Sequence, residues 1–145
     1  MKKILLAFVF GMITLSVFPQ KKVSFLDNEP WEKVLKQAQK AQKMVFVDCY
    51  TSWCGPCKKM LNTVFVQKEA GDFFNPRFVN IKYDMEKGEG INLKDRFGVK
   101  AYPTLLFING QGEVVHSLVG APGLKELIEQ AQIAFEGKGL AYADA

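Results

Sequence analysis

Hydrophobic positions recur along this chain with two different periods. Residues 31–41 and 124–135 carry apolar side chains three or four positions apart, which is the spacing of an amphipathic helix. Asn28, Glu29 and Pro30 combine a capping side chain with an early proline and predict the start of the first helix. Short β-rich runs predict strands over residues 44–50, 77–84, 104–108 and 113–119, and two shorter helices are predicted over residues 58–66 and 91–97.

The order of these elements predicts the fold class. Helices alternate with strands, and such alternation produces parallel strand pairs that are connected by crossing helices. Asn109 and Gly110 form a strong hairpin signal, so the last two strands should add an antiparallel edge. The expected architecture is α/β, with a central mixed sheet and helices on both faces. A length of 145 residues is typical of one domain.

The first twenty residues predict an export signal. Lys2 and Lys3 precede an uncharged apolar run over residues 4–18, which is shorter than the roughly 20 residues of a membrane span. We assign residues 1–20 to a signal peptide, residues 21–136 to the folded domain and residues 137–145 to a flexible tail. The domain is expected in the periplasm or another exported, oxidising space. The alternative is an uncleaved segment that acts as an N-terminal membrane anchor.

Composition and charge exclude several classes of protein. Hydrophobic residues make up 48% and charged residues 23% of the chain, which are values of a globular domain rather than a disordered one. The net charge is +4, and Lys2 and Lys3 supply two of these charges. No basic block remains in the domain, so nucleic-acid binding is not expected. Three cysteines are too few for a disulfide scaffold.

The chemistry is expected at Cys54-Gly55-Pro56-Cys57. This segment follows a predicted buried strand and precedes a helix, and a helix N-terminus stabilises a thiolate, the nucleophilic form of cysteine. We therefore expect Cys54 to be the exposed, attacking sulfur and Cys57, one turn further on and more buried, to resolve the mixed disulfide. Gly55 permits the tight turn, and Pro56 lies in the first helical turn, where its missing N–H costs little.

Two metal sites are alternatives for such a cysteine pair. Zinc needs four ligands, and the other soft candidates are Cys49 and His116, the only histidine. The spacing from Cys49 to Cys54 and Cys57 also matches the start of an iron–sulfur pattern, but that pattern needs a fourth cysteine. We therefore predict no metal and no other cofactor.

These residues carry a family resemblance. VDCYTSWCGPCK, residues 47–58, resembles the active-site strand and turn of thioredoxins, and GVKAYPTLLF, residues 98–107, resembles their second signature. The resemblance covers about residues 31–135 and implies a thioredoxin-like fold. Its front part is similar to small exported thioredoxins and to the C-terminal domain of transmembrane thiol:disulfide interchange reductases.

The resemblance implies roles for further residues. Cys54 and Cys57 match the redox-active disulfide, and Asp48 matches a buried acid that exchanges a proton with Cys57. Pro103 matches a cis-proline that lies against the disulfide. The substrate-binding rim is expected to comprise Trp53, Gly55, Pro56, Tyr102, Pro103, Gly120 and Ala121.

Three positions depart from the family pattern. Asn80 occupies the position that we align with the usual lysine partner of the buried acid, and Lys82 follows two residues later on the same face. Tyr102 precedes the proline where a smaller residue is usual. Cys49 replaces an aromatic residue, and strand alternation points it away from Asp48, so we expect a buried, inert thiol.

The predicted function is that of an exported, monomeric thiol:disulfide oxidoreductase that reduces protein disulfides. Its reducing equivalents would come from a membrane thiol-transfer protein. Gly55-Pro56 between the cysteines favours the reducing direction, since the resemblance associates this dipeptide with reducing members. The alternatives are a disulfide-forming oxidase or isomerase, and a non-catalytic binding module on the same scaffold.

Overall fold

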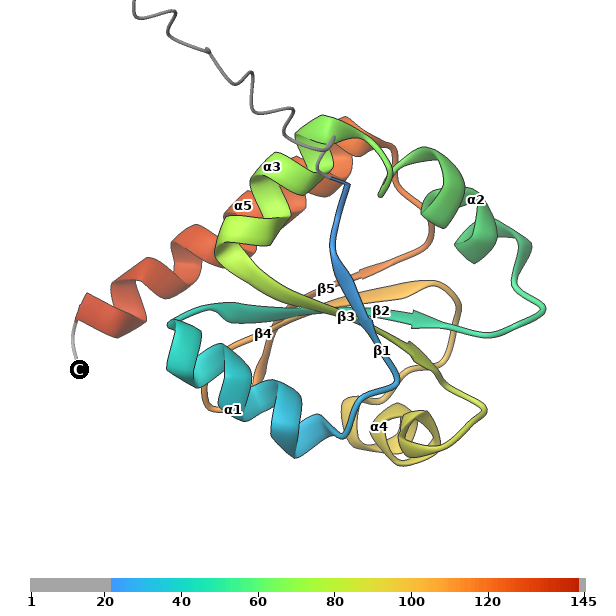
Figure 1. Cartoon of the computed structure of the whole chain (residues 1–145), viewed down its shortest axis with the longest axis horizontal. Coiled ribbons are helices and arrows are strands. Elements are labelled where there is room, and N and C mark those ends of the chain that lie inside the picture. Colours follow the sequence, from blue (N-terminus) through green and yellow to red (C-terminus); the bar gives the residue numbers. More distant parts are fainter. Residues whose placement is uncertain (1–21, 144–145) are drawn as a thin grey trace, which may run out of the picture.

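The protein folds around one five-stranded sheet with helices on both faces (Figure 1). The structure is a computed structural model that describes residues 22–143, and side chains as far as Gly137; the predicted signal segment lies outside the described residues. The elements in chain order are β1 (Phe25–Asp27), α1 (Trp31–Ala41), β2 (Met44–Tyr50), α2 (Gly55–Thr63), α3 (Lys68–Arg77), β3 (Phe78–Asp84), α4 (Glu89–Phe97), β4 (Thr104–Ile108), β5 (Val114–Val119) and α5 (Leu124–Ala143).

The sheet is mixed, as the sequence predicts. Its strand order is β1-β3-β2-β4-β5, and β3 pairs in parallel with both β1 and β2. β4 runs antiparallel to β2, and the hairpin that follows Ile108 adds β5 as an antiparallel edge. Because β2 and β3 are central and parallel, both end at the same edge of the sheet, where the Cys54 turn begins.

Each face of the sheet has its own apolar core. On one face, α2, α3 and α5 cover a cluster of aromatic rings around Phe46, whose ring centroid lies 4.7 Å from that of Phe74 and 5.2 Å from that of Phe107. On the other face, α1 and α4 pack on the alternate residues of β2, β3 and β4, with Trp31 and Tyr83 fully buried. Burial on both faces explains why β2 is an almost uninterrupted apolar run.

Two elements were not predicted from the sequence. β1 has three residues, too few for a recognisable alternation. α3 contains Gly71, Asn75 and Pro76, which all lower helix propensity, and its buried side chains, among them Phe74, pack on the sheet. Tertiary packing therefore overrides local preference in this segment.

Several boundaries also differ from the prediction. Pro30 occupies the N-cap position of α1 without a side-chain cap, and the Trp31 N–H donates instead to Glu89 Oε1 of α4 at 2.9 Å. α5 runs to Ala143 and so continues through most of the segment predicted as a tail, since the glycines there cost only about 1 kcal/mol each in a helix. Among residues 22–143, no helix combines the length and the apolar run that a membrane span requires.

Candidate functional site

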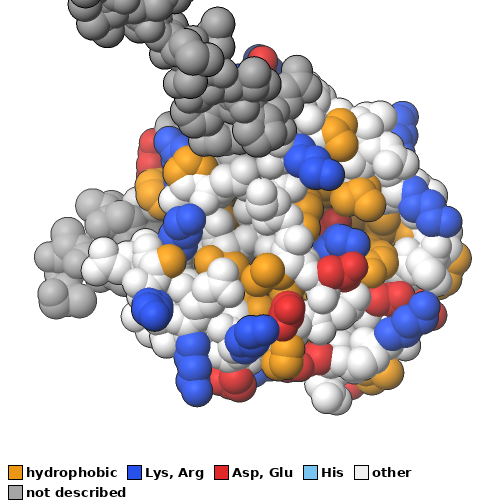
Figure 2. All heavy atoms as spheres, viewed as in Figure 1, with side chains coloured by type: hydrophobic (Ala, Val, Ile, Leu, Met, Phe, Trp, Pro, Cys, Tyr) orange, Lys and Arg blue, Asp and Glu red, His pale blue; other side chains and the backbone are white. Residues whose placement is uncertain are grey.

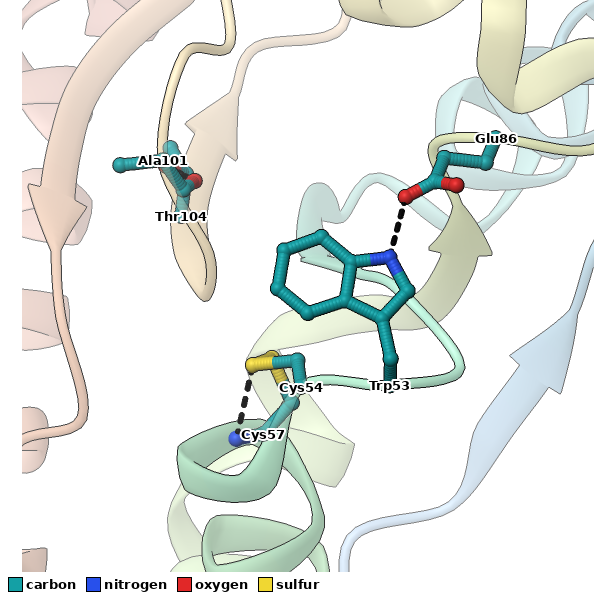
Figure 3. Close-up of a disulfide and its surroundings, with 6 residues drawn as sticks. All are labelled: Trp53, Cys54, Cys57, Glu86, Ala101 and Thr104. Carbon is teal, nitrogen blue, oxygen red and sulfur yellow. Dashed lines mark hydrogen bonds between the residues drawn. A yellow bond between two sulfur atoms is a disulfide. The ribbon is translucent and has the colours of Figure 1, made fainter.

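The cysteine pair lies where β2 passes into α2. The Cys54 N–H donates to the Thr51 carbonyl at 3.2 Å, which closes the turn, and Cys54 is the N-cap residue of α2. Its sulfur accepts a hydrogen bond from the Cys57 N–H at 3.2 Å (Figure 3). Cys54 and Cys57 form a disulfide with their Cα atoms 5.3 Å apart. The sulfur of Cys54 thus occupies the place of an oxygen cap, where the free N–H groups of the helix favour negative charge.

The exposure of the two cysteines differs from the prediction. In the disulfide form, the Cys54 residue is 3% and the Cys57 residue is 4% exposed, so both are buried and Cys54 is not the more exposed residue. The position at the helix terminus, rather than exposure, therefore distinguishes Cys54 as the sulfur with the better stabilised thiolate.

Trp53 forms an exposed platform beside the disulfide. Its side chain is 66% exposed, and its indole N–H donates to Glu86 Oε1 at 2.5 Å (Figure 3). The Tyr102 ring meets the indole edge to face, with ring centroids 6.0 Å apart. This contact joins the turn that carries the cysteines to the loop before β4, so two of the predicted rim residues lie side by side. Glu86 was not predicted as a site residue. Its position just beyond the end of β3 could have indicated it, because β2 and β3 end at the same edge of the sheet.

The loop before β4 and the loop between β5 and α5 complete the rim. The Tyr102–Pro103 peptide bond is cis, as predicted. The Pro103 carbonyl accepts the Gly120 N–H at 2.9 Å, which ties the two predicted rim segments together. Gly120 has φ +104°, a backbone conformation that favours glycine, and Ala121 follows it as an exposed residue. Gly55 and Pro56 lie exposed at the start of α2.

A cavity of about 200 Å³ lies beneath the disulfide, lined by Asp48, Thr51, Cys57, Leu61 and Lys82 among others. Asp48 is 3% exposed, and its Oδ1 atom has no hydrogen-bond partner. Burial raises the pKa of Asp48 from 3.8 to about 7, and the Lys82 charge partly opposes this shift. The structure therefore places a carboxyl group that titrates near neutral pH in the same cavity as Cys57.

The lysine that the structure places next to the buried acid is Lys82, and Asn80 does not take this role. The register of β2 and β3 pairs Asp48 with Lys82 and pairs Asn80 with Phe46. Asn80 instead donates to Asn75 Oδ1 at 3.2 Å, away from the cavity. The sequence places both residues on the same face but does not reveal the strand register, so it could not decide between them.

Cys49 lies on the opposite face of β2 from Asp48. It is fully buried in the core under α1 and α4, and burial, together with the Asp48 charge, raises the pKa of its thiol well above the usual value. The prediction of a buried thiol is confirmed. Within residues 22–143, no three His, Cys, Asp or Glu side chains are grouped so that they could hold a metal ion.

Comparison with known proteins identifies the family. The thioredoxin family model matches residues 22–132. Thioredoxin H4 from Arabidopsis thaliana is 34% identical over 94 residues, which are 65% of this chain and 74% of that protein.

Comparison with solved structures supports the same family. One described as a "putative disulphide-isomerase" from Bacteroides thetaiotaomicron is 47% identical, with a TM-score of 0.71 over 79% of this chain and 93% of that one. A Thermus thermophilus thioredoxin is 27% identical, with a TM-score of 0.69 over 82% and 94% of the two chains. The resemblance to exported thioredoxins and transmembrane reductases in particular stays a prediction. The chain belongs to the thioredoxin family and is a thioredoxin-like oxidoreductase with a Cys54–Cys57 disulfide.

Proposed function

We propose that this protein is an exported thiol:disulfide oxidoreductase that reduces disulfides in other proteins. The observation that carries the proposal is the position of Cys54. Its sulfur caps α2, adjoins the exposed Trp53 and is joined through Cys57 to the cavity that holds Asp48. A nucleophile, an apolar platform for a substrate chain and a proton acceptor are thus adjacent.

The first step is attack by the Cys54 thiolate of the reduced protein on one sulfur of a substrate disulfide. The substrate S–S bond breaks, and a new S–S bond joins Cys54 to the substrate. The departing substrate sulfur leaves as a thiolate and takes a proton from water. The exposed face of Trp53 and the rim at Tyr102 and Gly120 provide a surface against which the substrate chain can lie.

The second step uses Cys57 and Asp48. The ionised Asp48 carboxylate takes the proton of the Cys57 thiol, directly or through water, for which a cavity of about 200 Å³ has room. The Cys57 thiolate then attacks Cys54, the mixed disulfide breaks, and the substrate leaves with its second sulfur reduced. The protein ends as the Cys54–Cys57 disulfide, so two electrons have passed to the substrate.

The direction of exchange follows from how strongly the Cys54 thiolate is stabilised. No histidine lies between the cysteines, and Lys58 and Lys59 are exposed. The helix terminus therefore remains the main stabiliser, worth about 1–2 kcal/mol or less. Since about 1.4 kcal/mol corresponds to about 30 mV for a two-electron couple, the potential should stay low, as a reductant needs. In an oxidising space, the protein would receive electrons from a membrane thiol-transfer protein and act as a monomer.

Insulin reduction in the presence of dithiothreitol tests the activity. We expect the wild-type protein to accelerate precipitation of the insulin chains and Cys54→Ser to abolish the acceleration. Cys57→Ala should accumulate mixed disulfides with its substrates in the source cell, because the resolving thiol is missing. The mass of the protein from the exported fraction, with or without residues 1–20, tests localisation. Acceleration that survives Cys54→Ser would instead favour a non-catalytic binding module.

Isomerisation is the second candidate function. It is favoured by the 47% identity to the Bacteroides thetaiotaomicron protein described as a "putative disulphide-isomerase". Recovery of activity from scrambled ribonuclease, measured beside insulin reduction, separates the two functions. A reductase should accelerate insulin reduction much more than ribonuclease recovery, and an isomerase should show the opposite preference.

A further inference from the structure

Three charged side chains form a row across three neighbouring strands. The parallel register places Lys82 of β3 opposite Asp27 of β1 on one side and opposite Asp48 of β2 on the other. Residues paired in this way lie on the same face of a sheet, with strands about 4.8 Å apart. The Lys82 ammonium therefore has a carboxyl group on either side.

Lys82 pairs with the outer of these two groups. Its Nζ atom lies 3.0 Å from Asp27 Oδ2, whereas Asp48 Oδ1 is without a partner. The Tyr50 ring lies beside the same ammonium, with Nζ 5.5 Å from the ring centroid. The Asp27 side chain is 53% exposed, so water continues to solvate the ion pair.

Asp27 is itself held in place. The Asn28 side-chain amide donates to Asp27 Oδ1 at 2.6 Å, and Asn28 Oδ1 accepts the Asp84 N–H at 3.0 Å. The carboxylate of Asp27 is thereby anchored to the end of β3 and directed toward Lys82. β1 is the edge strand of the sheet that lies nearest the viewer in Figure 1, and acidic and basic side chains are interspersed on this side of the molecule (Figure 2).

We propose that Asp27 is a positioning residue of the redox site, which holds the Lys82 ammonium on the outer side of the cavity and away from the Asp48 carboxyl group. The proposal deepens the proposed function, on which its catalytic consequence rests. Without Asp27, the ammonium would lose its partner and turn toward Asp48. Asp48 would then ionise at lower pH, and it would accept the Cys57 proton in more acidic solution.

Other groups around Asp48 do not replace Lys82. From α2, Cys57 and Lys58 line the cavity, but Lys58 is exposed. From β3, Asp84 lies beyond Lys82 on the same face and pairs with Lys87 at 3.6 Å.

The remaining neighbours of Asp48 contribute no charged side chain that could move toward its carboxyl group. The residue of β4 opposite Asp48 is the apolar Leu105. On β2 itself, Tyr50 lines the cavity, and Cys49 points to the opposite face, where its raised pKa keeps it neutral. Lys82 is therefore the cation whose position can change the ionisation of Asp48.

The test is a titration of the Asp48 carboxyl carbon by NMR, in protein labelled with ¹³C-aspartate. The oxidised protein is used, because the disulfide removes the Cys54 and Cys57 thiols that would titrate together with Asp48. We expect Asp27→Asn to lower the Asp48 midpoint by about 1 unit or more. Asp27→Glu, which can still pair with Lys82, should keep the wild-type midpoint.

A double-mutant cycle separates positioning from a direct charge effect. If Asp27 acts through Lys82, Asp27→Asn should leave the Asp48 midpoint unchanged in a Lys82→Met background. An equal shift in both backgrounds, or no shift in the single variant, would overturn the proposal. Asp72→Asn, which removes an exposed carboxylate paired with Lys68 on α3, is the matched control and should cause no shift.

Activity provides a second, separable measurement. The acid limb of the pH profile for insulin reduction should move to lower pH in Asp27→Asn, by the same amount as the NMR midpoint. If the wild-type protein reduced no disulfide, the proposed function would fail, while the titration would still decide whether Asp27 positions Lys82. A moved midpoint with an unmoved profile would refute the catalytic part of the proposal.

Discussion

Replacing Asp48 with asparagine should make the protein more stable in alkaline solution and change its stability little in acid. Asp48 is 3% exposed, and its Oδ1 atom has no hydrogen-bond partner. Burial raises its pKa from 3.8 to about 7. Folding therefore favours the protonated acid, and ionising it inside the protein costs free energy that an asparagine does not incur.

The size of the effect follows from the shift in pKa. A rise from 3.8 to about 7 corresponds to about 4 kcal/mol, at about 1.4 kcal/mol per unit. Between these two values the folded protein binds a proton that the unfolded chain has released, so the free energy of unfolding falls as the pH rises. Above about pH 7 the carboxyl group is ionised in both states, and the whole penalty remains.

Guanidinium chloride unfolding of the oxidised protein, followed by circular dichroism at about pH 4 and about pH 9, measures this difference. From the lower to the higher pH, the wild-type protein should lose about 4 kcal/mol more than Asp48→Asn. Asp72→Asn, which removes the exposed carboxylate on α3, should follow the wild-type protein. Parallel pH dependence of the wild-type protein and Asp48→Asn would refute the reasoning, because Asp48 would then have an ordinary pKa.

Two further predictions concern packing. Phe46→Ala removes the central ring of the aromatic core and should lower the free energy of unfolding by about 3–5 kcal/mol in urea titrations, whereas Phe135→Ala, at a ring that is 38% exposed, should cost clearly less. Gly90→Ala would place a Cβ atom 1.9 Å from the Asp84 carbonyl oxygen and should lower the free energy of unfolding by about 1–3 kcal/mol or more. Gly137→Ala, with open space around it, should instead stabilise α5 by about 1 kcal/mol. Equal melting temperatures of the two glycine variants would contradict the second prediction.

The fold was largely predictable because its central elements are long and have clear periodicity. β2 and β4 were predicted with the bounds that the structure shows, and α4 ends at Phe97 as predicted. The failures have physical causes. β1 is stabilised by pairing with β3 rather than by its own sequence, and α3 by packing on the sheet, which a local pattern does not report.

The candidate site divides in the same way into local and non-local parts. Trp53, Cys54 and Cys57 lie close together in the chain, so their joint chemistry can be predicted from one short motif. The partners of Asp48 cannot be read in this way, because a shift in strand register by two residues exchanges Lys82 for Asn80 without changing the face on which either lies.

The same limit applies to Asp27, 55 residues from the Lys82 with which it pairs. The hydrophobic pattern fixes which face of β3 is polar, but Asn80 and Lys82, two of the polar positions on that face, are equivalent in sequence. Only the hydrogen-bonded ladder decides which of them faces the cavity. The nucleophile of this site is thus set by local sequence, and the electrostatic environment of its proton acceptor is set by the pairing of β1, β3 and β2.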